Sequence, residues 1–257
     1  MNILAILQAR TSSTRLPGKV LKPILGRPMI ERQIERLRRA KNFDRLIVAT
    51  SDDANDSALA ELCAELSVDC FRGSLNDVLD RFYQAALPHQ PQHVVRLTGD
   101  CPLADPGLID AVIAMHIANG NDYTANCLQA TFPDGLDVEV VRFSALAEAW
   151  REARLPSQRE HVLPFIHSAP ERYQIGHYRN DVDLSNLRWT VDEPGDYDLV
   201  SHIYEALYPA NPAFTTADIL MLLEKEPVLR TLNTHYVRNE GFLKSLQADE
   251  VFLSQGQ

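Results

Sequence analysis

The fold is decided by the opening stretch Asn2-Ile-Leu-Ala-Ile-Leu-Gln-Ala-Arg10-Thr-Ser-Ser-Thr-Arg15-Leu-Pro-Gly-Lys19-Val-Leu-Lys22-Pro-Ile-Leu-Gly-Arg27. Residues 3–7 are an apolar run of the kind typical of a strand buried on both faces of a parallel sheet. A polar loop follows at once. Open α/β sheets bind their ligands beyond the carboxyl ends of the strands, so we expect this loop to lie at a binding site.

This loop is basic in an otherwise acidic protein. Five basic residues precede the first acidic one, while the chain has a formal net charge of −10; they are Arg10, Arg15, Lys19, Lys22 and Arg27. Arg and Lys supply the charge that binds polyphosphate, and small or hydroxyl-bearing neighbours let backbone N–H groups approach an anion. Those neighbours are Ser12, Ser13, Thr14 and Gly18. The pattern indicates a triphosphate site, although a solvated basic loop would have the same composition.

The loop matches neither of the two common nucleotide motifs. A Walker loop requires Ser or Thr after Gly-Lys, but Val20 follows Gly18-Lys19 here. A dinucleotide fingerprint requires glycines directly after the strand, where this chain has Gln8-Ala9-Arg10. A triphosphate site in this loop must therefore have a different design.

Composition limits the classes of function. The 257 residues, 45% of them hydrophobic, suit one large α/β domain. The acidic balance argues against nucleic acid as a partner, and no apolar run approaches the roughly 20 residues of a membrane span. The four cysteines show no C-x-x-C spacing, and the N-terminus has no signal-peptide pattern. We therefore expect reduced thiols and a cytoplasmic location.

Strands and helices alternate four times in the first 120 residues. This rhythm predicts a three-layer, doubly wound, mostly parallel α/β sheet with right-handed crossovers. The predicted strands are 3–7, 45–50, 68–71 and 93–97, and the predicted helices are 28–40, 59–66, 77–87 and 105–119. We expect this part, residues 1–120, to form the nucleotide-binding half of a single domain spanning 1–257.

The rhythm changes after Gly120, which predicts an insertion in the second half. The predicted strands are 122–125, 136–143, 174–178 and a last core strand 188–191, and the predicted helices are 144–153, 159–167, 195–207 and 216–225. The tail after Pro227 is expected to be helix and coil. Residues 121–257 would then form the acceptor-binding half and the C-terminal helices.

Two carboxylates follow predicted core strands. Asp100 comes after the strand 93–97, and Asp192 ends the predicted strand 188–191. Each has an ordinary alternative, since Asp100 could form a turn before Pro102 and Asp192 could cap a helix. Magnesium binds one or two carboxylates together with phosphate oxygens, and such a pair suits metal-assisted phosphoryl transfer. We therefore predict Mg²⁺ as the cofactor.

Three motifs resemble one known family. The segment Gln8-Ala-Arg-Thr-Ser-Ser-Thr-Arg-Leu-Pro-Gly-Lys19 closely resembles the opening of the cytidylyltransferases that include the CMP-3-deoxy-manno-octulosonate and CMP-sialate synthetases, and is nearest to the spore coat polysaccharide biosynthesis protein F branch. Leu97 to Leu103 is similar to the G-D-x-P segment of that family. Trp189 to Pro194 is similar to its D-x-P-x-D segment, with Gly195 where Glu is frequent. The resemblance covers about residues 1 to 200.

The resemblance implies a nucleotide-diphospho-sugar transferase-like fold and a CTP-dependent nucleotidyltransferase. Such an enzyme transfers CMP to an acidic sugar resembling a nonulosonate or octulosonate, releases pyrophosphate and serves surface polysaccharide biosynthesis. A homodimer is implied as well.

The family assigns roles residue by residue. The implied nucleotide contacts are Gln8, Ala9, Arg10, Ser12, Ser13, Arg15 and Lys19, with Arg72, Ser74 and Arg81 near the base. The implied acceptor contacts are Asp134, Asp137, Glu139, Arg159 and His161. Asp100 and Asp192 would bind Mg²⁺, and Arg10, Arg15, Lys19 and Asp100 would carry catalysis.

Plainer interpretations stay open for the base and acceptor residues. Arg81 could lie on the outer face of a helix, Asp137 and Glu139 could be the polar face of a strand, and Arg159 and His161 could begin an exposed helix. The segment Gln158 to Pro164 is similar to an acceptor-side motif of the spore-coat branch, but Leu163 stands where that motif often has Thr. These departures leave the identity of the acceptor undecided.

Two other functions compete with cytidylyl transfer. A nucleotide-sugar-dependent glycosyltransferase would use a similar sheet, but such enzymes usually have Asp-x-Asp, which Gly99-Asp100-Cys101 lacks. A nucleotide-binding scaffold without turnover is the other alternative. The presence of both aspartates and all the loop cations argues against it.

Overall fold

The first strand lies inside a seven-stranded sheet. The computed structural model describes residues 2–255, and its strand order is β5-β4-β1-β6-β8-β7-β9. Neighbouring strands are parallel except around β8, which runs antiparallel to both β6 and β7. The bounds are β1 Ile3–Gln8, β4 Arg45–Ser51, β5 Asp69–Gly73, β6 His93–Thr98, β7 Tyr123–Ala125, β8 Glu139–Arg142 and β9 Ile175–His177. The predicted mostly parallel α/β sheet is confirmed.

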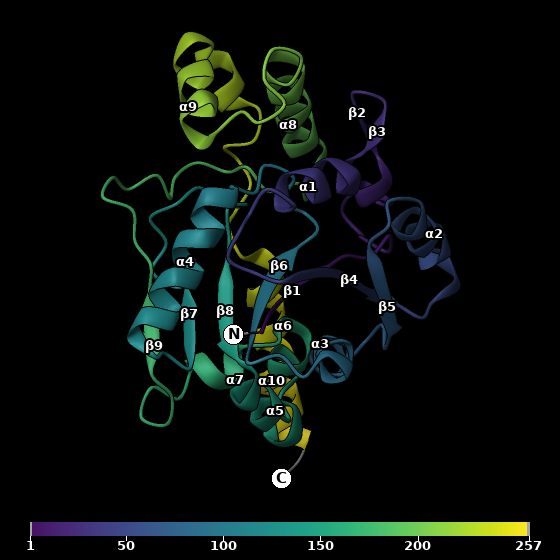
Figure 1. The fold of residues 1–257 in the computed structure, drawn as a ribbon, viewed down its shortest axis with the longest axis vertical. Coiled ribbons are helices and arrows are strands. Elements are labelled where there is room, and N and C mark those ends of the chain that lie inside the picture. The colour runs from purple at the N-terminus through teal and green to yellow at the C-terminus, as the bar shows by residue number, and fades with distance from the viewer. Residues whose placement is uncertain (1, 256–257) are drawn as a thin grey trace.

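Helices cover the sheet on both faces, as Figure 1 shows. They are α1 Met29–Leu37, α2 Ser57–Glu65, α3 Val78–Ala86, α4 Pro106–Asn119, α5 Phe143–Glu152, α6 Pro156–His161, α7 Pro164–His167, α8 Pro194–Leu207, α9 Thr216–Lys225 and α10 Glu240–Gln255. Short 3-10 helices span Lys19–Leu21, Ala54–Asp56, Leu87–His89 and Pro227–Thr231. A two-stranded hairpin, β2 Pro23–Ile24 and β3 Arg27–Pro28, forms the end of the basic loop and was not predicted.

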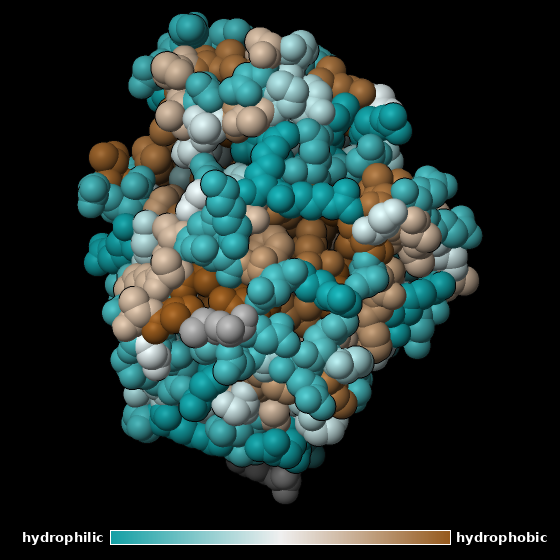
Figure 2. Space-filling view, in the orientation of Figure 1, coloured by the Kyte–Doolittle hydropathy of each residue, from teal (hydrophilic) through white to brown (hydrophobic). Residues whose placement is uncertain are grey.

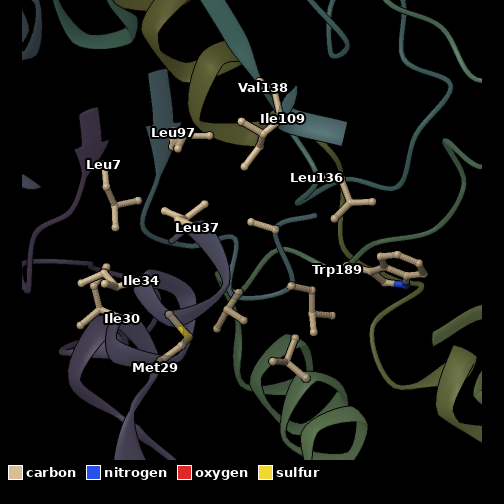
Figure 3. Close-up of a cluster of buried hydrophobic side chains, with 14 of the residues drawn as sticks. Leu7, Met29, Ile30, Ile34, Leu37, Leu97, Ile109, Leu136, Val138 and Trp189 are labelled. Atoms are coloured by element: carbon tan, nitrogen blue, oxygen red, sulfur yellow. The ribbon is translucent and has the colours of Figure 1, made fainter. Parts of the chain in front are cut away.

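Two hydrophobic clusters lie on opposite faces of the sheet because successive side chains of a strand point to opposite sides. Along β1, Ala5 and Leu7 pack with α1, α2 and α4, whereas Leu4 and Ile6 pack with α3 and α5. Figure 3 shows the first cluster, in which Trp189 from the second half lies on the side of Leu136. The same cluster contains residues of α1 and β6. The indole of Trp189 is 1% exposed, so the two halves of the sequence share one core.

The prediction of a last core strand at 188–191 is wrong. This segment is extended, but its one bridge within the described residues joins Arg188 to Asp134. The N–H of Trp189 donates to the carbonyl of Asp134 over 2.6 Å, and the N–H of Val191 donates to the carbonyl of Asp100 over 2.7 Å. The segment therefore pairs with two loops of the sheet edge instead of a strand.

A glycine permits this close approach. Gly135 has φ 101°, and a Cβ atom there would lie 2.3 Å from the backbone nitrogen of Thr190. Any other residue would push the two backbones apart. The sequence Asp134-Gly135 thus fixes where the 188–191 segment, and with it Asp192, meets the sheet.

Other boundaries also differ from the predictions. The strand predicted at 136–143 begins only at Glu139, and the helix predicted at 159–167 is two short helices, α6 and α7. Val162 separates them with φ 73°, a conformation that β-branched residues rarely adopt. The tail after Pro227 contains a long helix, α10, which packs against α6.

Hydrophilic residues cover most of the face in Figure 2, and hydrophobic residues gather around its middle. Across residues 2–255, none of the helices combines the length and the apolar character that crossing a membrane requires.

Candidate active site

A cavity of about 350 Å³ opens where β1 and β6 end. Its walls come from the basic loop, the ends of both strands, the end of α6, the loop before α8 and the first turns of α10. The lining residues are Gln8, Ala9, Arg10, Ser12, Ser13, Thr14, Arg15, Lys19, Val20, Arg96, Thr98, Gly99, Asp100, Glu160, His161, Asp192, Gly241 and Lys244. The cavity therefore brings Arg10, Arg15 and Lys19 together with Asp100 and Asp192, whereas Lys22 and Arg27 of the basic loop do not line it.

The ends of β1 and β6 meet tightly beneath the cavity. The N–H of Gly99 donates to the carbonyl of Gln8 over 2.7 Å. A Cβ atom on Gly99 would lie 2.8 Å from the Cβ of Ala9, so a side chain there would separate the two strands. This packing holds Asp100 directly beside the loop that begins at Ala9.

Lys19 lies between the two predicted metal ligands. Its Nζ is 2.7 Å from Asp192 Oδ1 and 3.5 Å from Asp100 Oδ2, and it donates to the carbonyl of Val191 over 2.8 Å. Burial lowers the pKa of Lys19, but the two carboxylates outweigh burial and raise it. Burial likewise raises the pKa of Asp100, and the ammonium of Lys19 outweighs burial and lowers it. Lys19 and Asp100 are therefore both charged at neutral pH.

The two arginines of the loop are paired more loosely. Arg15 reaches Asp192 at 3.0 Å, Glu240 of α10 at 3.3 Å and Glu193 at 3.6 Å. Arg10 lies 3.5 Å from Glu160 at the end of α6. Side chains on both sides of these contacts are partly exposed, and such ion pairs contribute about 0–1 kcal/mol each. An incoming polyphosphate can therefore replace these carboxylates at little cost.

The loop itself is anchored by a carboxylate that the sequence analysis did not single out. Asp56, which is 1% exposed, accepts hydrogen bonds of 2.7 Å from both the N–H and the hydroxyl of Thr11. Ser13 Oγ accepts from the N–H of Leu16 over 3.3 Å. These contacts fix the backbone that carries Ser12 and Ser13 into the cavity.

The three residues predicted near the base lie together but outside the cavity lining. Arg72 donates to the carbonyls of Ser51 and Asp53, and Ser74 Oγ accepts from the N–H of Asp77. Arg81 is fully buried and donates to the carbonyl of Ser74 over 2.6 Å. Its Nε and Nη2 have no partner among the described residues. Their role at a base stays a prediction.

A second cavity of about 300 Å³ adjoins the first and shares Arg96, Thr98 and His161 with it. Asp137, Glu139 and His161, three of the five predicted acceptor residues, line it. The lining residues are Arg96, Thr98, Cys127, Leu128, Asp137, Glu139, His161, Pro164, His167, Asn239 and Phe242. A small polar molecule in this cavity would border directly on a nucleotide in the first.

The other two predicted acceptor residues serve contacts elsewhere. Asp134 is buried against Arg188 at 3.1 Å and Arg238 at 3.7 Å. Arg159 pairs with Asp77 and donates to the carbonyl of Trp150. Neither belongs to the residues that line the two cavities.

His161 joins the cavities to the C-terminal helix. Its Nε2 lies 2.9 Å from the hydroxyl of Ser245, and its ring meets Phe242 edge-on at 5.1 Å. Burial lowers the pKa of His161 to about 4, so the ring is neutral at pH 7. His161 is therefore a buried, neutral hydrogen-bonding group in the lining of both cavities.

Several site residues were missed. Arg96 lies within β6 and pairs with Glu139, and its charge between the apolar residues Val95 and Leu97 was the available signal. Glu240 and Lys244 gave no such signal, because they belong to a tail without a recognised motif.

Arg188 also belongs to the site. It connects Asp192 at 3.5 Å with the fully buried Asp196 at 2.8 Å, and so orients the predicted metal ligand.

The carboxylate pair has the right chemistry for magnesium. Asp100 and Asp192 both lie within reach of one ammonium nitrogen, which shows that they converge. Within residues 2–255 there is no cluster of three or more His, Cys, Asp or Glu side chains for a metal. Magnesium that is shared with a triphosphate needs no such cluster, since phosphate oxygens complete its shell.

The fold and the known relatives define the chain as a nucleotidyltransferase. It belongs to the cytidylyltransferase family, whose model matches residues 4–250, and the resemblance seen in the sequence is thereby confirmed.

Three known proteins illustrate the similarity. Spore coat polysaccharide biosynthesis protein SpsF of Bacillus subtilis is 35% identical over 233 residues, covering 88% of this chain and 95% of its own. The 3-deoxy-manno-octulosonate cytidylyltransferase of Syntrophotalea carbinolica is 36% identical over 114 residues, 44% of this chain and 45% of its own. The structure of a cytidylyltransferase from Leptospira borgpetersenii superposes with a TM-score of 0.86 at 31% identity, covering 92% of this chain and 100% of its own.

Proposed function

We propose that the protein transfers CMP from CTP to a hydroxyl group of a small acidic sugar, resembling an octulosonate or nonulosonate, and releases pyrophosphate. The observation that carries this proposal is the meeting of Lys19, Asp100 and Asp192 in the lining of a cavity that Arg10 and Arg15 also line. The family supplies the reaction, and the relatives named for octulosonate and spore coat polysaccharide suggest the acceptor and a role in surface polysaccharide biosynthesis.

Positioning and charge neutralisation account for most of the catalysis that this site can supply. Phosphoryl transfer involves little covalent chemistry for the protein, so alignment and electrostatics dominate. Arg10, Arg15 and Lys19 would bind the β- and γ-phosphates and stabilise the departing pyrophosphate. The acceptor, held in the second cavity, would attack the α-phosphate in line.

Asp100 and Asp192 would hold a magnesium ion, which supplies charge neutralisation at the triphosphate. Arg188 and Arg15 would orient the carboxylate of Asp192, because both guanidinium groups contact it. Lys19 would then move its hydrogen bonds from these carboxylates to phosphate oxygens. The cation set of the cavity thus serves two tasks in turn, balancing the aspartates first and the nucleotide afterwards.

The first test is the melting temperature of the purified protein with each of the four ribonucleoside triphosphates, with and without Mg²⁺. A ligand that binds only the folded state stabilises it by about 2.7 kcal/mol at a hundredfold excess over its Kd. A rise selective for CTP and strengthened by Mg²⁺ is the expected result. A shift with UDP-sugars and none with CTP would instead favour the glycosyltransferase.

The acceptor is then sought by pyrophosphate release from CTP, with 3-deoxy-manno-octulosonate and N-acetylneuraminate as the first two probes. A matched series of neutral sugars tests whether the acid group matters. The homodimer stays a prediction from the resemblance, and the cytoplasmic location stays a prediction from the sequence. Light scattering of the purified protein measures the oligomeric state directly.

A further inference from the structure

The acceptor hydroxyl has to lose a proton during cytidylyl transfer, and the second cavity contains a carboxylate suited to accept it. We propose that Asp137 is the general base that removes this proton from the attacking hydroxyl group. The inference rests on the proposed function, since it names a catalytic residue for that reaction.

Asp137 is placed where an acceptor would lie. It lines the second cavity, and this cavity shares Arg96 and Thr98 with the one that receives the nucleotide. The side chain is 29% exposed, and its Oδ1 accepts a hydrogen bond of 3.1 Å from Arg238. Among the side-chain contacts of residues 2–255, none reaches Oδ2. One carboxylate oxygen is therefore held in place by Arg238 while the other keeps its lone pairs for a ligand.

In the neighbouring carboxylate, that of Glu139, each oxygen already has a partner. Glu139 Oε1 accepts from the hydroxyl of Tyr123 over 2.6 Å, and Oε2 pairs with Arg96. Its side chain is only 10% exposed. Glu139 therefore shapes the wall of the cavity and neutralises Arg96, whereas Asp137 has an oxygen left for a substrate proton.

The histidines of the second cavity are weaker bases. Burial lowers the pKa of His161 to about 4, and its Nε2 already meets Ser245. Burial lowers the pKa of His167 as well. Burial raises the pKa of the Cys127 thiol well above its usual range, which leaves it protonated. Of the titratable groups lining this cavity, Asp137 is the one that has both an oxygen open to a ligand and a pKa suited to a base.

The surroundings of Asp137 set its basicity near neutral pH. Burial raises its pKa to about 7, against the opposing charge of Arg238 from the segment before α10. Three carboxylates add to the rise: Asp134 from the loop before β8, Glu139 on β8 itself and Asp100 after β6. A general base works best when its pKa lies near the working pH, so this carboxylate is tuned for its task.

The proposed step conserves atoms and charge. The acceptor O–H bond breaks, its proton goes to Asp137 Oδ2, and the oxygen lone pair forms the new bond to the α-phosphorus. The bond between the α-phosphorus and the bridging oxygen breaks at the same centre, and its electron pair leaves with pyrophosphate. Asp137 then returns the proton to solvent when the product departs.

The kinetic test compares Asp137→Asn with the wild type in pyrophosphate release from CTP and Mg²⁺, using 3-deoxy-manno-octulosonate and N-acetylneuraminate as acceptors. Asn keeps an acceptor oxygen for Arg238, so we expect KM for CTP to change less than about twofold. Turnover should fall by at least about a hundredfold, within the usual contribution of a general base. The wild type should lose activity on the acid side of pH 7, and the variant should lack this dependence. The control is Asp181→Asn, an exposed position outside both cavities.

A second measurement does not depend on the acceptor. In protein labelled with ¹³C at aspartate carboxyl carbons, the signal missing from Asp137→Asn identifies Asp137, and it should titrate with a midpoint near pH 7. A midpoint below pH 5, or an unchanged acid limb in the rate profile of Asp137→Asn, would overturn the assignment. Failure of CTP to stabilise the wild type would reject the proposed function instead, so the two failures can be told apart.

Discussion

The Nζ of Lys19 lies 2.7 Å from Oδ1 of Asp192, although 173 residues separate them in the sequence. The same nitrogen lies 3.5 Å from Asp100, which follows the neighbouring strand. One ammonium group thus balances two carboxylates from distant segments. Without it, the two negative charges would repel each other at the edge of the sheet.

Replacing Lys19 by Met should reduce pyrophosphate release by at least about a hundredfold, the usual loss when one preorganised electrostatic group is removed. The variant should also unfold more easily, because breaking a buried ion pair typically costs about 3–5 kcal/mol. Urea denaturation measures the second effect. Lys41→Met, at an exposed position, is the control. Turnover close to that of the wild type would remove Lys19 from the catalytic group.

Asp100→Asn should lower turnover by at least about a hundredfold, since the amide keeps the shape of the side chain but loses its charge. The concentration of Mg²⁺ needed for half-maximal activity should rise at the same time. Titrating Mg²⁺ at saturating CTP measures both effects. The matched control is Asp69→Asn, a surface residue of β5 that pairs with Arg45. An unchanged Mg²⁺ requirement would contradict the metal assignment.

Asp249→Ala should loosen α10. The Asp249 carboxylate accepts hydrogen bonds from the N–H of Ser157 over 2.8 Å and from its hydroxyl over 2.5 Å, at the start of α6. Leaving such buried donors unpaired costs about 1–3 kcal/mol. Hydrogen exchange should therefore speed up along α10, and KM for CTP should rise because this helix lines the cavity. Glu250→Ala, one residue along and exposed, should behave like the wild type in both measurements.

His116 should make the fold sensitive to acid. It is fully buried between His93 at 2.9 Å and Thr124 at 3.0 Å, and burial lowers its pKa to about 4. Below about pH 6.5 this histidine is protonated in the unfolded chain, whereas in the folded protein it stays neutral down to about pH 4. The free energy of unfolding should fall through this window by up to about 3 kcal/mol.

The matching experiment follows unfolding by urea at pH 7 and pH 4. His116→Gln should lose less stability between the two pH values than the wild type does, whereas His202→Gln, at an exposed position, should lose as much. Equal losses in all three proteins would show that His116 does not account for the acid sensitivity.

Much of the nucleotide-binding half could be predicted from the sequence, because local patterns of apolar and polar residues indicate its strands and helices. The four alternations up to Asn119 are all present, and Lys19, Asp100 and Asp192 meet as their motifs implied. The segment at 188–191 shows the limit of such patterns. Its alternation of apolar residues correctly indicates that the segment is buried. The backbone of the segment bonds to Asp134 and Asp100 and not to a strand, and this close approach depends on Gly135, about fifty residues earlier.

The acceptor side was harder for the same reason. Asp137 and Glu139 alternate along one segment and look equivalent in sequence. Tyr123 and Arg96, however, occupy the two carboxylate oxygens of Glu139 only. No local pattern distinguishes the two residues, since the difference between them comes from partners on other strands. The contribution of α10 was missed because its sequence carries no recognisable motif. Its position depends on the contact between Asp249 and Ser157.

The position of α10 has a consequence for how the enzyme is made. The basic loop leaves the ribosome early in synthesis, but Gly241, Lys244 and Phe242 of the cavity walls emerge more than two hundred residues later. The cations of the basic loop are therefore made long before the residues of α10 that complete the cavity wall. Because the chain is made from its N-terminus, the cavity wall is complete only after α10 has packed against α6.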